Sequence, residues 1–184
     1  KNIKMTKKFT LFVITLFSLT IATAQVKLEK IKGSKIVTVT IKEVESFENV
    51  EIEEFLDVYF VKSEKTSIEI EADDNLHDII SYNILGNTLK ITALKQPTGE
   101  KKLAIRVNYN DSLKTIVARH ESKINALADI ALENITIKNF DKSQSFLNVK
   151  STNFTLIMTD KSKAEINVKA DKTVVELSKD AKVK

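Results

Sequence analysis

The sequence predicts an all-β protein built as a parallel β-helix, or β-solenoid, with coils of about 19–21 residues. Three observations favour this fold. Val, Ile, Thr and Phe alternate with polar residues over most of the chain after residue 24, a period of two that is typical of strands with one buried face. No stretch has a helical period for more than about one turn. The chain from Lys114 onward repeats itself, as helix-free solenoids do.

Before the repeats, the alternation predicts seven strands. A Gly86-Asn87 turn separates two of them, and residues 96–99 (Gln-Pro-Thr-Gly) are expected to form a loop. Asp74–Ile80 is expected to form one helical turn, with Asp73 or Asp74 as its cap. The expected strands are Lys35–Lys42, Asn49–Glu54, Leu56–Lys62, Ser67–Ala72, Tyr82–Leu85, Thr88–Thr92 and Lys102–Tyr109.

The repeats have a period of 19 residues, the spacing that separates Ile135, Phe154 and Thr173. Leu147–Lys150 recurs as Ile166–Lys169 one period later. Stacked coils place equal positions beside one another, about 4.8 Å apart. The repetition would also fit hairpins of an antiparallel β-sandwich, which stays open as the alternative fold.

This stacking predicts ladders of equal side chains. Ile130, Val149 and Val168 would form an apolar ladder inside the solenoid, while Asn148 and Asn167 would form a polar one at a corner or on the outside. One period earlier, the 19-residue register places Ile116 and Ala118 beside Ile135 and Ile137, and His120 in the column of Asn139, Met158 and Leu177. The Glu121-Ser122 turn indicates a slip of two residues in that first coil.

Residues 1–24 have the order of a secretory signal peptide: Lys4, Lys7 and Lys8, an uncharged apolar run at Phe9–Thr20, and Ala22-Thr23-Ala24 before Gln25. An uncleaved N-terminal anchor is the alternative, although the apolar run is short for a membrane span, which needs about 20 residues. Residues 25–184 are expected to form one domain. Because Lys184 falls in mid-coil, we expect the natural chain to continue beyond it.

Charge and composition exclude several classes of function. Of 29 Lys and Arg residues, four (Lys1, Lys4, Lys7 and Lys8) lie in residues 1–24, so the rest of the chain carries 25 basic and 25 acidic side chains. That balance, with only two arginines, argues against nucleic-acid binding. The chain has no cysteine, so it has neither disulfides nor a lipidated cysteine after the signal.

The segments Ser46–Ile52, Leu56–Phe60, Ile68–Leu76 and Asn87–Ile91 resemble the opening of the bacterial GIN domain, the head domain of adhesins of the auto-transporter type. The resemblance covers almost all of residues 25–184. It implies a right-handed β-helix with small-residue turns and an exported adhesin-like protein, with no site residues to carry over. Where the family has a turn glycine this chain has Glu121, Lys142, Lys161 and Asp180, each followed by Ser122, Ser143, Ser162 or Ala181.

We therefore predict no catalytic, cofactor-binding or metal-binding residues. Asp73, Asp74, Asp78 and His77 would be the first candidates for an acid pair or a weak cation site, but a solvated turn with a cap explains them better. His120, the other histidine, has no acid or nucleophile assignable to it from sequence, and two isolated histidines make no zinc site.

The expected function is that of an exported, non-catalytic, adhesin-like binding or structural domain at the bacterial cell envelope or surface. A polysaccharide lyase or hydrolase built on a β-helix is the alternative, because many such enzymes share this shape. The expected partners are a glycan or a surface or matrix protein, with no nucleic acid and no stable membrane span. The expected location is the periplasm, the outer-membrane surface or the extracellular space.

Overall fold

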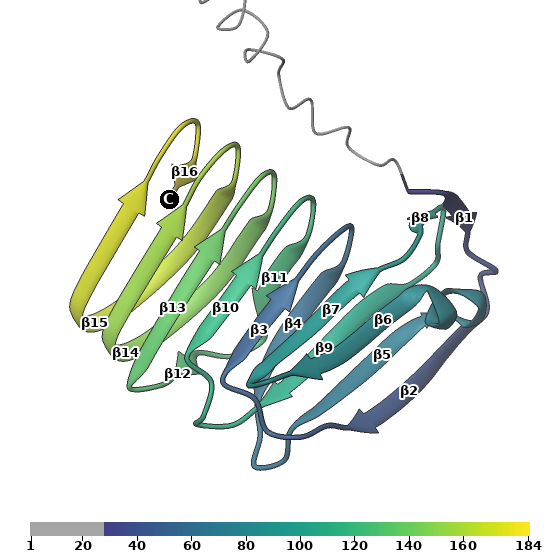
Figure 1. Ribbon diagram of the computed structural model, residues 1–184, viewed down its shortest axis with the longest axis horizontal. Helices are drawn as coiled ribbons and strands as arrows, with labels where there is room; N and C mark the ends of the chain where they lie inside the picture. The colour runs from purple at the N-terminus through teal and green to yellow at the C-terminus, as the bar shows by residue number, and fades with distance from the viewer. Residues whose placement is uncertain (1–27) are drawn as a thin grey trace, which may run out of the picture.

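The computed structural model describes residues 28–184, so the predicted signal peptide and its cleavage site lie outside the described residues. The described part is all-β apart from one short 3-10 helix, η1 (Asp74–Ile79). Most strands join one sheet that curls around an apolar core (Figure 1). No helix within residues 28–184 is long and apolar enough to cross a membrane.

The strands, in chain order, are β1 (Lys30–Lys32), β2 (Val37–Glu43), β3 (Asn49–Ile52), β4 (Asp57–Lys62), β5 (Ser67–Asp73), β6 (Ile80–Leu85), β7 (Thr88–Ala93), β8 (Gln96–Thr98), β9 (Leu103–Tyr109), β10 (Thr115–Ala118), β11 (Lys123–Ala126), β12 (Ile130–Ala131), β13 (Asn134–Asn139), β14 (Gln144–Met158), β15 (Lys163–Leu177) and β16 (Lys182–Val183).

The seven strands predicted before the repeats are all present, with ends shifted by at most a few residues. The helical turn is present as η1. Antiparallel pairs lie at the N-terminal end of the sheet, where β2 pairs with β5, β5 with β9, and β6 with β7. These strands close the end of the sheet that carries the N-terminal half of the chain (Figure 1).

The predicted loop at residues 96–99 is wrong, because Gln96–Thr98 is strand β8. It pairs in parallel with β1, a strand that the sequence analysis did not predict. Pro97 has no N–H to donate, and it is tolerated here because a two-stranded ribbon leaves one edge of each strand unpaired. The two short strands form a strap outside the main sheet.

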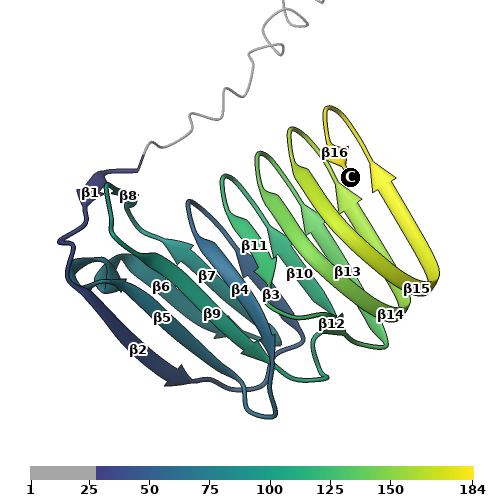
Figure 2. The ribbon, with the colours of Figure 1, turned by 180° about the vertical axis from the view of Figure 1, so that it is seen from behind.

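The repeats pair in parallel with the predicted period of 19 residues. Phe154 of β14 lies opposite Ile135 of β13 and Thr173 of β15, and Leu147 lies opposite Ile166. The antiparallel alternative is therefore wrong for this half of the chain, where every strand pair from β10 to β16 is parallel. Figure 2 shows the repeats from behind, with their turns aligned along one edge.

The prediction of a 19-residue register is wrong for the first repeat. The predicted slip of two residues is confirmed there. Ile116 lies opposite Ile137 rather than Ile135, a step of 21 residues. Ile130 lies opposite Val149, so the 19-residue step is restored there. The two additional residues are accommodated in the exposed segment 127–129, which no strand pairs.

The inward-facing ladder is confirmed. Val149 lies between Ile130 and Val168 and is 2% exposed, while Ile130 is fully buried. Val168 is 38% exposed because β16 pairs only with Lys163 and Ala164 of β15 and leaves the rest of that strand uncovered. Each repeat thus buries the apolar residues of the one before it.

The polar ladder is confirmed as well, and it lies on the outside. The Asn167 side-chain amide donates to Asn148 Oδ1 at 2.8 Å, and both residues are exposed. Inside, one inward column carries the buried Asn139, whose amide bonds Ser143 Oγ at 3.2 Å and Ser145 Oγ at 2.7 Å. These bonds satisfy polar groups that would otherwise be costly to bury.

We predict that Val149→Asp lowers the free energy of unfolding by several kcal/mol, because it buries an unpaired charge between two apolar neighbours. Lys150→Ala should cost less than about 1 kcal/mol, because it removes only an exposed ion pair with Asp129. Urea denaturation of both variants measures the two losses. Similar losses at the two positions would show that the inward and outward faces are assigned wrongly.

Candidate functional site

Asp73, the first residue suspected of acid chemistry, is fully buried and serves the fold. Its carboxylate accepts backbone N–H bonds from Lys35 at 2.9 Å, Lys101 at 3.1 Å and Lys102 at 3.0 Å. Burial acts to raise the pKa of Asp73, but the N–H donors of Lys101, Lys35 and Lys102 outweigh it and hold this pKa below its usual value. Asp73 occupies the N-cap position of η1, as predicted, but its side chain makes no capping hydrogen bond to the turn that follows.

Gly33 is needed because the backbone approaches this carboxylate closely. A Cβ atom at Gly33 would lie 2.3 Å from Asp73 Oδ2 and 2.7 Å from Glu100 Cα, so any side chain would clash. The Gly33 N–H donates to the Thr98 carbonyl at 3.1 Å. Asp73 therefore holds the strap of β1 and β8 against the sheet.

The other three candidates do not converge with Asp73. Asp74 is exposed and accepts a hydrogen bond from the Ser34 hydroxyl. His77 Nε2 lies 3.0 Å from Thr38 Oγ1, and Asp78 is exposed. Within residues 28–184 no group of three His, Asp, Glu or Cys side chains is placed to hold a metal ion.

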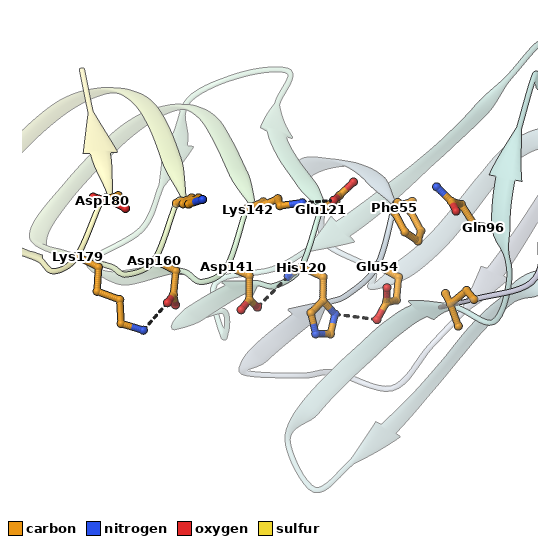
Figure 3. A pocket seen from close by; sticks show the side chains of 12 residues that line it. Glu54, Phe55, Gln96, His120, Glu121, Asp141, Lys142, Asp160, Lys179 and Asp180 are labelled. Atoms are coloured by element: carbon orange, nitrogen blue, oxygen red, sulfur yellow. Dashed lines mark hydrogen bonds and ion pairs between the residues drawn. The ribbon is translucent and has the colours of Figure 1, made fainter. Parts of the chain in front are cut away.

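The aligned turns of the repeats form a second candidate, a groove of about 950 Å³ along one corner (Figure 3). One column of this corner has a positive φ in every repeat, between 55° and 63°, and contains Glu54, His120, Asp141, Asp160 and Lys179. The prediction that the glycine-replacing residues are Glu121, Lys142, Lys161 and Asp180 is therefore off by one position. Asp and His adopt this left-handed region more readily than most residues, which is why no glycine is required there.

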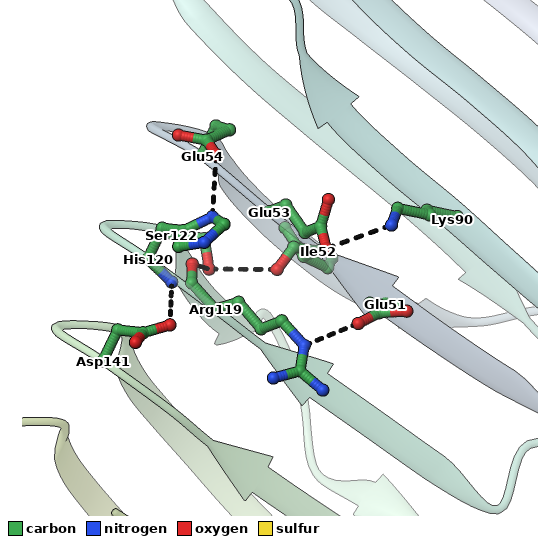
Figure 4. Close-up of polar contacts among 9 residues, drawn as sticks. All are labelled: Glu51, Ile52, Glu53, Glu54, Lys90, Arg119, His120, Ser122 and Asp141. Atoms are coloured by element: carbon green, nitrogen blue, oxygen red, sulfur yellow. Dashed lines mark hydrogen bonds and ion pairs between the residues drawn. The ribbon is translucent and has the colours of Figure 1, made fainter. Parts of the chain in front are cut away.

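His120 lies beside residues that the sequence could not assign to it. It falls in the column of Asp141, not of Asn139, because of the two-residue slip. Its Nδ1 lies 2.8 Å from Glu54 Oε1, and its backbone N–H donates to Asp141 Oδ2 at 3.1 Å (Figure 4). The partner acid was missed because Glu54 is distant in sequence and only the stacking of turns brings the two together.

No nucleophile accompanies this His-Glu pair. The nearby Ser122 is fully buried, and its hydroxyl donates to the Arg119 carbonyl at 2.8 Å. The Arg119 side chain is engaged too: its Nε lies 2.6 Å from Glu51 Oε1, and its guanidinium lies 4.4 Å from the centre of the Phe140 ring. The contacts of Ser122 and Arg119 thus join adjacent repeats.

Two ion pairs join other charged residues in the corner groove. Lys142 pairs with Glu121 at 2.9 Å, and this hydrogen bond raises the Lys142 pKa. Hydrogen bonds from Lys179 and then from Thr159 lower the pKa of Asp160. The corner is thus a ladder of ion pairs between repeats, and we assign it a structural role.

Comparisons with known proteins identify the family of the chain and its structural neighbours. A family model described as "Putative auto-transporter adhesin, head GIN domain" matches residues 46–184. No curated protein matches the chain.

Solved structures share the fold at low sequence identity. A putative adhesin from Parabacteroides distasonis aligns with a TM-score of 0.71 at 17% identity, over 84% of this chain and 67% of that one. A putative lipid binding protein from the same organism aligns with a TM-score of 0.70 at 15% identity, over 81% and 65%. A putative adhesin from Bacteroides fragilis aligns with a TM-score of 0.53 at 13% identity, over 83% and 98%. This chain spans about two thirds of the length of the first two.

We predict that Asp73→Asn destabilises the protein at neutral pH, because an amide cannot accept from all three backbone donors. The pKa of Asp73 is lower in the folded protein than the value of about 3.9 for an unfolded Asp. The ionised carboxylate therefore contributes fully to the free energy of unfolding above about pH 3.9, and this contribution is lost as the pH falls through the folded pKa. Urea denaturation at a series of pH values should therefore show the gap between wild type and Asp73→Asn narrowing below about pH 4.

The matched control is Asp78→Asn, which changes an exposed carboxylate of the same segment and should have little effect at any pH. The structural role of Asp73 would be contradicted if wild type and Asp73→Asn had equal free energies of unfolding at neutral pH, or if their difference stayed constant down to pH 3.

Proposed function

Because the chain belongs to the GIN-domain family of auto-transporter adhesin heads, we propose that it is an exported, non-catalytic binding domain that acts at the bacterial cell envelope or surface. The Lys, apolar and Ala-x-Ala order of residues 1–24 supports export, with residues 25–184 as the working domain. We further propose that the stacked repeats wind as a right-handed parallel β-helix. Their in-register parallel pairing supports this.

We infer the binding role from rows of polar side chains on the outer faces of the sheet, where paired positions of neighbouring strands expose similar residues. Asn49, Thr115, Thr136 and Thr155 lie beside one another on four neighbouring strands, all partly exposed. The Asn148 and Asn167 pair forms a shorter row on the other wall. Such walls are broad and shallow, which suits contact with an extended surface ligand at many weak points.

The contacts of the candidate acids and histidines support a non-catalytic function. The Asp73 carboxylate is bonded by three backbone donors, and the His120 and Glu54 pair has only a buried, bonded serine nearby. A polysaccharide-active enzyme remains the competing function, and the experiment is designed to detect it.

We predict that the purified protein, screened with calcium present against glycans, host matrix proteins and lipid vesicles, retains at least one of these ligands without turnover. Retention on an array and product analysis of the same samples measure the two properties together. Release of unsaturated or shortened sugar products that is lost in Asp74→Ala or Asp78→Ala would establish the enzyme instead. Those two residues are exposed, so the variants are expected to fold.

A further inference from the structure

We propose that the wall formed by β4, β11, β15 and residues 144–150 of β14 binds an anionic polysaccharide. Phe146 is the surface on which one sugar ring stacks, and Lys123, Lys163 and Lys182 meet the carboxylate or sulfate groups of the chain. This inference rests on the proposed binding function and names its ligand class.

The three lysines form one row across the wall. Lys123 lies opposite Gln144, Gln144 opposite Lys163, and Lys163 opposite Lys182, so the row advances by about 4.8 Å at each step. All three lysines are exposed. None of their ammonium groups forms an ion pair with residues 28–184, whereas Lys142 on the adjoining corner is paired with Glu121.

Phe146 is an aromatic ring that the fold leaves in water. Its strand neighbours Ser145 and Leu147 are buried, so the alternation of the strand turns Phe146 outward, where it is 43% exposed. The ring helps to line a hollow of about 350 Å³, together with Gln144, Lys163, Lys182 and the acidic Glu165. A hollow with an aromatic surface, an amide and a cation can bind a ring that has an apolar face and a polar edge.

A second aromatic residue, Tyr59, lies on the same wall as Phe146. Tyr59 lies opposite Asn125, which lies opposite Phe146, so the backbones at these two aromatic positions are about 9.6 Å apart, twice the strand spacing. That distance is close to the span of two sugar rings in an extended chain. The amides of Asn125 and Gln144 lie beside the rings and can bond hydroxyl groups.

The charge of this wall favours an anionic ligand. Two carboxylates lie beside the lysine row of this wall: Glu165 lies opposite Phe146 and pairs with Lys184 at 3.3 Å, and Asp57 lies opposite Lys123 and accepts from the Asn125 amide at 2.5 Å. The four lysines Lys123, Lys163, Lys182 and Lys184 outnumber these two carboxylates. The unpaired lysine row therefore gives local positive charge on a chain that is balanced from residue 25 onward. A protein partner is less favoured because the arginine on the adjacent strand β9, Arg106, is held by both oxygens of Glu69 at 2.8 Å.

Binding of polygalacturonate and of dextran sulfate to the full chain tests the proposal and separates the two anionic groups. At least one of them should bind, with an affinity that falls as salt is added. Phe146→Ala should weaken that binding by about tenfold, and Phe146→Tyr should restore it. Lys163→Ala should weaken it by about threefold to fivefold and reduce the dependence on salt.

Two matched controls lie on the other wall. Phe140→Ala removes a partly exposed ring that packs on Arg119, and Lys138→Ala removes a lysine from an outward-facing position of β13. Neither should change binding. Polyglutamate, which has carboxylates but no sugar ring, should bind weakly and be insensitive to Phe146→Ala.

The outcomes distinguish this inference from the proposed function. Equal binding of polyglutamate and polygalacturonate, or no effect of Phe146→Ala, would overturn the stacking site. If neither polysaccharide binds while the protein retains another surface ligand, this inference is wrong and the binding function stands. If no surface ligand is retained at all, both are wrong.

Discussion

Hydrogen bonding between equal positions of successive repeats is the interaction on which the rest of the structure depends. Because Leu147, Val149 and their counterparts in the next repeat are paired residue by residue, the same positions face inward in each repeat. A shift of one residue would turn every apolar side chain outward. The chain tolerates a 21-residue first repeat only because the additional residues lie in the exposed segment 127–129, between the paired strands.

The aligned turns follow from the same constraint. Each repeat must reverse in the same place, and the reversal uses one residue in the left-handed region, which costs a non-glycine residue about 1–2 kcal/mol. Asp141 and Asp160 carry this conformation with little difficulty, whereas Glu54 and Lys179 are less usual there. The contact between Glu54 Oε1 and His120 Nδ1, and the ion pair between Lys179 and Asp160, tie these turns to their neighbours.

Local patterns predicted most of the fold. The alternation of apolar and polar residues located the strands, and the repeat of Leu147–Lys150 at Ile166–Lys169 gave the register that the structure has. Contacts between distant segments were not predictable in this way. Strand β8 exists because β1 lies beside it, and Asp73 is structural because the backbone N–H groups of residues 35, 101 and 102 converge on it.

Part of the candidate binding wall could have been predicted from the sequence. With Val149 placed inward, the period of two already turns Phe146 outward, between the outward Gln144 and Asn148. The row of Lys123, Gln144 and Lys163 could not be predicted, because it requires the 21-residue step of the first repeat. The proposed binding site on this wall thus depends on the register as much as the core does.

Spin labels on neighbouring repeats test that register most directly. The chain contains no cysteine, so Asn148→Cys and Asn167→Cys can be labelled together without background. Their positions are paired directly, about 4.8 Å apart along the ladder, so continuous-wave electron paramagnetic resonance should show strong dipolar broadening. A doubly labelled protein whose spectrum equals the sum of the two single-label spectra would contradict in-register stacking of the repeats.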